Sequence, residues 1–298
     1  MISPMRRADA AICGRTTTWS WTNPAVTTAN DTHANAIAAV RIGATRDLCT
    51  QPLYRTLSSS SGSPGELLFE TPAVHIDALM SNERTAAVVA PVDYAQNSSD
   101  MVIYPKVGVS STGASGFVRL YLRKHLAHIT TLAVGNVTAT DVVLARIILA
   151  EKYDAEPAIV PVAGSVDDML AKADVALVSG DALFSVQTDA PFIDLVDEWS
   201  DITELPFVHA IYIGRSGTYS AELAQALEVS QDAGRLSLAV IAEEQSAQRN
   251  IPVPLLKEFL SHFSYGFGDL EKLSLEEFFR MAFYHGMLGD IPEITFPE

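Results

Sequence analysis

Cysteine is nearly absent from this chain of 298 residues, which contains only Cys13 and Cys49. Cys13 lies in an N-terminal segment without sustained periodicity, so we do not expect a structural disulfide. No group of His and Cys residues has the spacing of a zinc site. The sequence therefore argues against a disulfide-stapled scaffold and a structural zinc domain, and it fits a reducing compartment.

Basic residues are also scarce, with 20 Lys and Arg against 36 Asp and Glu, for a formal net charge of −16. Binding to nucleic acid or to an anionic membrane surface needs a basic face, so both are disfavoured as partners. A small anionic ligand remains compatible with this charge, because a local cleft can be positive while the outer surface is acidic.

No apolar run reaches the roughly 18–20 residues that a membrane-spanning helix requires. Met1–Arg7 carries two arginines, but no apolar segment of a secretory signal follows them. From these features we expect a cytoplasmic protein that does not associate with a membrane.

Hydrophobic residues make up 48% of the chain, which is enough for a sizeable buried core. Residues 1–38 show no sustained pattern and are expected to form a poorly ordered extension. From Ala39–Gly43 onward, short apolar runs alternate with amphipathic segments, of which Asp141–Tyr153 is the clearest helix. This alternation predicts an α/β fold with mainly parallel pairing.

The length and the order of the elements predict two lobes. We expect residues 39–125 and 236–298 to form the first lobe and residues 126–235 the second, with the chain crossing near Leu120–Thr131. A cleft between two such lobes is a common place for a ligand site.

The most specific stretch of the sequence is Ala173–Gly214. An apolar run ends in Ser179-Gly180-Asp181-Ala182-Leu183, and an acidic segment with Trp199 then precedes the apolar block that begins at Leu205. A carboxylate directly after a buried strand and beside a glycine is not needed for packing. The pattern therefore suggests a loop that faces a ligand.

With these two blocks the chain resembles the menaquinone-biosynthesis family of the futalosine route, most closely its chorismate dehydratase branch. Weaker likenesses lie at Arg41–Ala44 with Pro52-Leu53 and at Ala145–Tyr153. The resemblance implies a two-lobed type II periplasmic-binding-protein fold with an interlobe cleft. It also implies a cytoplasmic lyase that removes water from chorismate, a small dicarboxylate, to give 3-enolpyruvylbenzoate. No metal or redox cofactor is expected for this redox-neutral elimination, and a homodimer is left open.

The chain departs from the family pattern in two loops that would line the ligand. The opening loop usually reads like SYLNT, whereas in this chain it reads Arg46-Asp47-Leu48-Cys49-Thr50. The loop before the crossover helix usually reads like SRTS, and in this chain it is Asn136-Val137-Thr138-Ala139-Thr140. These changes leave open whether chorismate is still the substrate.

The resemblance, together with local chemistry, selects eight substrate-binding candidates. Arg46 follows the first strand and can pair with a carboxylate through two hydrogen bonds. The start of a helix offers free N–H groups to an anion, and a turn rich in hydroxyl groups can hold a second polar group. The candidates are Arg46, Thr50, Ser111, Thr112, Ser115, Asn136, Thr138 and Thr140. The structural alternatives are a surface ion pair for Arg46, a helix cap for Asn136 or Thr138, and an ordinary polar turn.

Asp181 is the candidate catalytic residue. Apolar neighbours would raise its pKa and favour proton transfer, whereas the structural alternative is a cap on the following turn. His209 is interpreted as a core histidine on an apolar strand, and Cys49 as a small buried thiol.

Three other functions remain open from the sequence. The first is a non-catalytic protein that binds a small carboxylate, and the second is 1,4-dihydroxy-6-naphthoate synthase of the same pathway. The third is a relative whose altered opening loop recognises a different cyclic acid.

Overall fold

The computed structural model describes residues 40–57 and 65–297. The predicted N-terminal extension, residues 1–38, lies outside the described residues. Within them, no helix is both long enough and apolar enough to cross a membrane.

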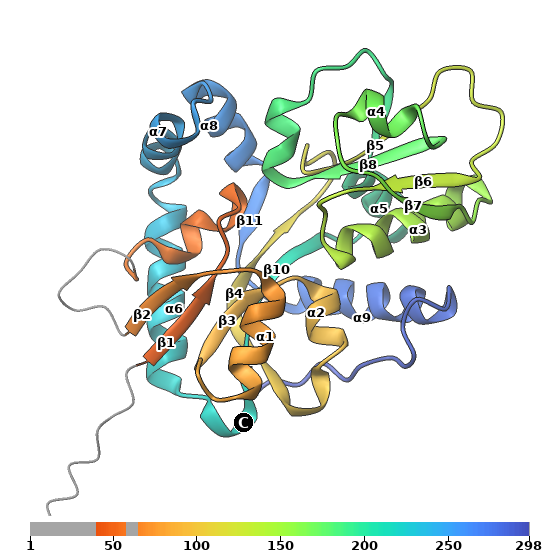
Figure 1. Cartoon of the computed structure of the whole chain (residues 1–298). Coiled ribbons are helices and arrows are strands. Elements are labelled where there is room, and N and C mark those ends of the chain that lie inside the picture. The colour runs from red at the N-terminus through yellow and green to blue at the C-terminus, as the bar shows by residue number, and fades with distance from the viewer. Residues whose placement is uncertain (1–39, 58–64, 298) are drawn as a thin grey trace, which may run out of the picture. The chain divides into compact units, whose positions relative to one another are not determined.

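Six of the described strands form the first sheet, in the order β11, β4, β10, β3, β1, β2 (Figure 1). Their bounds are β1 Val40–Ala44, β2 Gly65–Phe69, β3 Ala86–Val89, β4 Met101–Ser111, β10 Phe207–Arg215 and β11 Phe263–Tyr265. β3 and β10 are almost wholly buried, which explains their largely apolar sequences, whereas in β1 only Ile42, Gly43 and Ala44 are buried.

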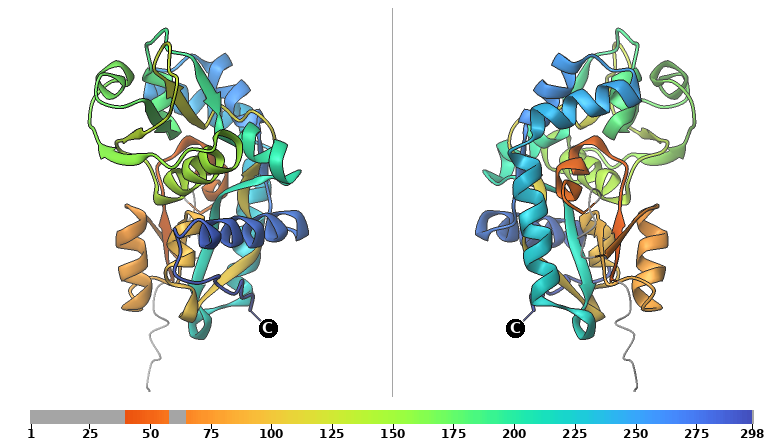
Figure 2. Two further views of the ribbon diagram at one scale, coloured as in Figure 1. Left: turned by 90° about the vertical axis from the view of Figure 1, so that its right-hand side faces the viewer. Right: turned by 90° about the vertical axis from the view of Figure 1, so that its left-hand side faces the viewer.

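Helices cover both faces of the first sheet (Figures 1 and 2). α1 (Pro72–Met80), α2 (Pro91–Ala95) and α9 (Asp269–Tyr284) pack on one face, and α6 (Ala221–Arg235) packs on the other together with the 3-10 helix η1 (Leu48–Tyr54). α7 (Leu238–Arg249) and α8 (Val253–Ser261) pack against each other, α7 also contacts η1, and α8 also contacts β11. Two short 3-10 helices, η2 and η4, span Ser98–Asp100 and Ser216–Thr218.

Five further described strands form the second sheet, in the order β7, β6, β8, β5, β9. α4 packs on β5, β6 and β8, while α3 and α5 contact each other and lie against β8 and β5 respectively. The bounds are β5 Val118–Leu122, β6 Thr131–Val134, β7 Ala158–Pro161, β8 Val175–Ser179, β9 Phe192–Asp194, α3 Ala139–Tyr153, α4 Val166–Leu170, α5 Leu195–Thr203 and η3 Gly180–Ser185.

The α/β class is as predicted, but the pairing is mixed rather than mainly parallel. β1 runs parallel to β2 and β3, and β6 runs parallel to β7 and β8. β10 is antiparallel to both of its neighbours, and so is β5. The physical reason is that these two strands bring the chain from one sheet into the other and enter their new sheet from the opposite direction.

The chain crosses between the two sheets at residues other than those expected. β5 was expected in the first lobe and pairs in the second sheet, whereas β10 was expected in the second lobe and pairs in the first sheet. The chain leaves the first sheet through Thr112–Phe117, where Gly113 and Gly116 have φ values of +71° and +67°. Both strands are largely apolar, so their sequences do not reveal which sheet they join. The division into lobes at the predicted residues remains a proposal.

One large hydrophobic cluster runs through the first sheet and along one face of the second. Trp199 of α5 is fully buried in it and packs edge-on against Phe207 and Phe278. A smaller cluster fills the space between α4 and the other face of the second sheet. Consecutive residues of β5, such as Leu120 and Tyr121, point to opposite faces of the sheet and pack in different clusters.

Candidate functional site

A cavity of about 790 Å³ is lined by residues of both sheets. From the first sheet come the segments that follow β1 and β3, and from the second come the segments that follow β6 and β8. Ligands commonly bind at the carboxyl ends of parallel strands. The volume suits a small organic molecule.

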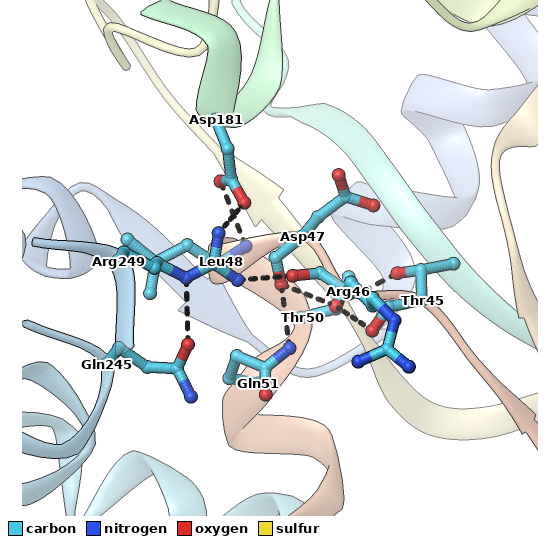
Figure 3. Close-up of polar contacts among 9 residues, drawn as sticks. All are labelled: Thr45, Arg46, Asp47, Leu48, Thr50, Gln51, Asp181, Gln245 and Arg249. Carbon is cyan, nitrogen blue, oxygen red and sulfur yellow. Dashed lines mark hydrogen bonds and ion pairs between the residues drawn. The ribbon is translucent and has the colours of Figure 1, made fainter. Parts of the chain in front are cut away.

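The opening loop between β1 and η1 forms one wall of this cavity (Figure 3). The hydroxyl of Thr50 donates to the carbonyl oxygen of Asp47 at 2.8 Å and lies 3.0 Å from the hydroxyl of Thr45. Thr50 is buried and lines the cavity, but these bonds occupy its side chain. Its observed contacts hold the loop in shape.

Arg46 lines the cavity with an exposed side chain. Its guanidinium carbon lies 5.1 Å from the centre of the Phe69 ring, a cation–π contact. Within residues 40–57 and 65–297, no carboxylate forms an ion pair with Arg46. Figure 3 shows this side chain pointing away from Arg249. Arg46 therefore presents a charge that is not neutralised by an ion pair in the described part of the chain.

Asp181 lies at the start of η3, directly after β8 and Gly180. Gly180 has a φ of +68°, a conformation that a residue with a Cβ rarely adopts, and it turns the chain at the strand end. One oxygen of Asp181 accepts the N–H of Leu48 at 3.1 Å, and the other pairs with the guanidinium of Arg249 (Figure 3). Burial raises the pKa of Asp181, while Arg249 and the Leu48 N–H act in the opposite direction.

Arg249 was not identified from the sequence, although it organises this corner of the cavity. From the end of α7 it donates to Asp181, to the main-chain oxygen of Arg46 and, at 2.8 Å, to Gln245. One side chain thus connects α7, η3 and the opening loop. An arginine near the end of a surface helix carries no sequence signal for this role.

The start of α3 forms the opposite wall, with Asn136, Thr138 and Thr140 all lining the cavity. Thr138 is the N-cap, and its hydroxyl accepts the N–H of Asp141 at 3.1 Å. The hydroxyl of Thr140 accepts the N–H of Val92 at 2.9 Å. The two hydroxyl groups therefore have internal partners, whereas Asn136 is exposed and forms no side-chain hydrogen bond with the described residues.

The hydroxyl-rich turn does not reach the cavity wall. Ser111 and Ser115 are buried, and the Ser115 hydroxyl accepts the N–H of Phe117. Thr112 is exposed, but it does not line the cavity. The physical reason is that β4 extends to Ser111, so that this residue belongs to the sheet, and the chain then crosses to the second sheet.

His209 lines the cavity, although the sequence suggested a core histidine. It is buried, with 8% of its surface exposed, and it stands with Phe207 and Phe117 on an aromatic wall. Burial lowers the pKa of His209 to about 3, so the imidazole is neutral at physiological pH. Its position near the start of β10, beside the cavity end of the sheet, is visible only in three dimensions.

Several carboxylates also line the cavity, and burial raises the pKa of three of them, Asp93, Asp141 and Asp181. Cys49 is a free, buried thiol whose pKa is raised by burial, which makes it a poor nucleophile. In the part of the chain that the structure describes, no three His, Cys, Asp or Glu side chains form a group that could hold a metal ion.

Comparison with known proteins gives a family and a curated relative. A family model described as menaquinone biosynthesis matches residues 40–284. The chain is 24% identical over 229 residues to the chorismate dehydratase of Thermus thermophilus, and the match covers 71% of this chain and 84% of that protein.

Solved structures share the fold at lower identity. Protein AF1704 from Archaeoglobus fulgidus superposes with a TM-score of 0.65 at 16% identity, covering 84% of this chain and 99% of that one. The periplasmic aliphatic sulphonate binding protein SsuA from Escherichia coli gives 0.62 at 12% identity, covering 86% and 95%. These likenesses support a two-lobed type II periplasmic-binding-protein fold, and the family match shows that the chain belongs to the menaquinone-biosynthesis family.

Proposed function

We propose that this protein is a chorismate dehydratase, a hydro-lyase that converts chorismate to 3-enolpyruvylbenzoate and water in menaquinone biosynthesis. The observation that carries the proposal is the composition of the cavity. It combines the guanidinium of Arg46, the start of α3 and an aromatic wall of Phe117, Phe207 and His209. This combination suits a planar ring acid with two carboxylates, and the family match and the dehydratase relative support the same reaction.

Arg46 is the proposed partner of one substrate carboxylate. A guanidinium forms two parallel hydrogen bonds with a carboxylate, and each such charged bond contributes about 1.5–3 kcal/mol. The cation–π contact with Phe69 places the guanidinium without neutralising its charge. Arg46 is therefore available to an incoming anion.

The start of α3 is the proposed site of the second carboxylate. The first N–H groups of a helix have no partners within it, and the helix dipole favours an anion there. Asn136 adds a side-chain amide, whereas Thr138 and Thr140 contribute by shaping the wall, because their hydroxyls bind Asp141 and Val92. Burial raises the pKa of Asp141, which accepts hydrogen bonds from Ser179 and from the N–H of Thr138 at this helix start.

Asp181 is the proposed base. The reaction breaks a ring C–H bond and the ring C–OH bond, and it releases the proton and the hydroxyl as water while the ring becomes aromatic. Each oxygen of Asp181 retains a lone pair beyond its bonds to Leu48 and Arg249. A raised pKa brings the carboxyl closer to the working pH of a proton acceptor.

A direct assay tests this function. Purified protein is incubated with chorismate, and substrate loss and formation of the enolpyruvyl benzoate are followed by mass spectrometry. Conversion that depends on Asp181 supports the proposal. Binding of chorismate in a thermal-shift titration without conversion would instead identify a binding protein. If chorismate is neither bound nor converted, a different cyclic acid becomes the candidate substrate.

A cytoplasmic location belongs to the same proposal. The oligomeric state, including a homodimer, can be measured by light scattering of the assayed sample.

A further inference from the structure

Ser111 and His209 form a buried hydrogen-bonded pair at the back of the cavity. The hydroxyl of Ser111 lies 2.7 Å from Nε2 of His209. Ser111 is on β4 and His209 is on β10, which are neighbouring strands of the first sheet. Because Nε2 is engaged by Ser111, only Nδ1 is left for a ligand.

Aromatic rings fix the imidazole on its other sides. The centres of the Phe117, Phe207 and Phe263 rings lie 4.9, 5.2 and 5.3 Å from the centre of the His209 ring, each close to edge-on. Such packing leaves the ring little rotational freedom. It also surrounds the imidazole with apolar groups, which explains why His209 stays neutral.

Nδ1 of His209 remains accessible. It has no hydrogen-bond partner among the described residues, and it is not among their fully buried polar atoms that lack a partner. The exposed part of His209 opens on the cavity, where the neighbouring wall residues Phe117, Phe207 and Ala210 provide no polar side-chain atom. If a ligand ring lies against this wall, a polar group on that ring can form a hydrogen bond with Nδ1 of His209.

We propose that His209, oriented by Ser111, forms a hydrogen bond through Nδ1 with the ring hydroxyl of the substrate. This inference rests on the proposed function, and it gives the site a residue that distinguishes the hydroxylated substrate from its dehydrated product. A neutral imidazole on an apolar wall can orient a leaving hydroxyl without adding charge to the site. In this role His209 binds the substrate and Ser111 is a positioning residue.

The test compares two ligands that differ in the ring hydroxyl. The first readout is kcat/KM for chorismate, and the second is the Kd of 3-enolpyruvylbenzoate measured by calorimetry. His209→Phe is expected to lower kcat/KM about tenfold, the loss of one buried hydrogen bond. The same variant should change the Kd of the product by less than about twofold, because the product has no ring hydroxyl.

Three variants separate this role from a structural one. His209→Asn keeps an amide near the position of Nδ1 and should recover part of the loss seen in His209→Phe. Ser111→Ala leaves the imidazole in place but removes its orienting bond, so it should lower kcat/KM for chorismate and leave the product Kd unchanged. Phe207→Leu alters the wall without touching a polar atom and should affect both ligands alike.

The outcomes distinguish the two proposals. If the wild type converts chorismate and His209→Phe weakens both ligands equally, or neither, then the hydroxyl contact is wrong and the proposed function stands. If the wild type neither binds nor converts chorismate, then the proposed function fails and the hydroxyl contact fails with it.

Discussion

The hydroxyl of Thr140 accepts a hydrogen bond from the main-chain N–H of Val92 at 2.9 Å. Thr140 is in the first turn of α3, which packs on the second sheet, and Val92 is in the short helix α2, which packs on the first. This buried bond therefore joins the two sheets beside the cavity. Thr140 was predicted from the sequence to bind the substrate, but its hydroxyl already has this partner within the protein.

Thr140→Val is expected to destabilise the protein by about 1–3 kcal/mol, because the N–H of Val92 would be left buried without a partner. Thr140→Ser keeps the hydroxyl and should retain most of the stability. Urea unfolding followed by circular dichroism measures both variants. Equal stability of Thr140→Val and wild type would show that this bond contributes nothing to the stability of the fold.

Arg46→Ala is expected to raise the KM for chorismate by about tenfold or more, because one charged, two-pronged contact with a carboxylate is lost. Arg46→Lys should give an intermediate value, since an amino group cannot make the paired contact. The matched control is Arg41→Ala, which removes the same charge from an exposed ion pair with Glu66 outside the cavity. A KM unchanged in Arg46→Ala would remove Arg46 from the site.

Much of the scaffold follows from periodicity in the sequence. The apolar run that precedes Gly180 is strand β8, and the predicted helix Asp141–Tyr153 is α3, which begins two residues earlier at Ala139. In both segments burial selects apolar residues, and the resulting pattern of apolar residues can be recognised locally in the sequence. The short elements α2, β9 and β11 lack enough residues to show a period, and tertiary contacts determine them.

The site was predicted less completely, because its residues come from distant parts of the chain. Arg46, Thr50, Asn136, Thr138, Thr140 and Asp181 all line the cavity, whereas Ser111, Thr112 and Ser115 do not. Strand ends and helix starts can be recognised in a sequence, so residues there were found. Arg249 is 68 residues from its partner Asp181, and nothing in the sequence of α7 indicates that pairing.

Asp181→Asn is expected to lower kcat by about a hundredfold or more while changing KM little, because the carboxyl is proposed to accept the ring proton.

Removing the guanidinium in Arg249→Met takes away a charge that lowers the pKa of Asp181. The pKa should then rise, and the acidic limb of the kcat/KM profile should move to higher pH. Arg235→Met, which breaks an exposed ion pair with Asp232 on α6, is the control and should leave the limb in place.

An unshifted limb in Arg249→Met, or full activity in Asp181→Asn, would contradict the role of Asp181 as a base. Its bonds to Leu48 and Arg249 would then be its whole function, as a connection between η3, the opening loop and α7.

Burial of the His209 imidazole predicts how the stability of the fold depends on pH. Burial lowers the pKa of His209 to about 3 in the folded protein, against about 6.5 for an unperturbed histidine. Between these values the unfolded chain binds a proton that the folded protein excludes, so this residue makes folding less favourable as the pH falls. The contribution to stability is complete above about pH 6.5 and is lost progressively toward pH 3.

We therefore expect the stability of the wild type relative to His209→Phe to fall by about 2 kcal/mol between pH 7 and pH 5. Urea titrations of both proteins at the two pH values measure this difference. The comparison between variants is needed because Asp93, Asp141, Asp181 and Asp194 have raised pKa values and act in the opposite direction in both proteins. A difference that does not change with pH would mean that His209 binds a proton as readily in the folded protein as in the unfolded chain, and the apolar enclosure inferred for its imidazole would then be wrong.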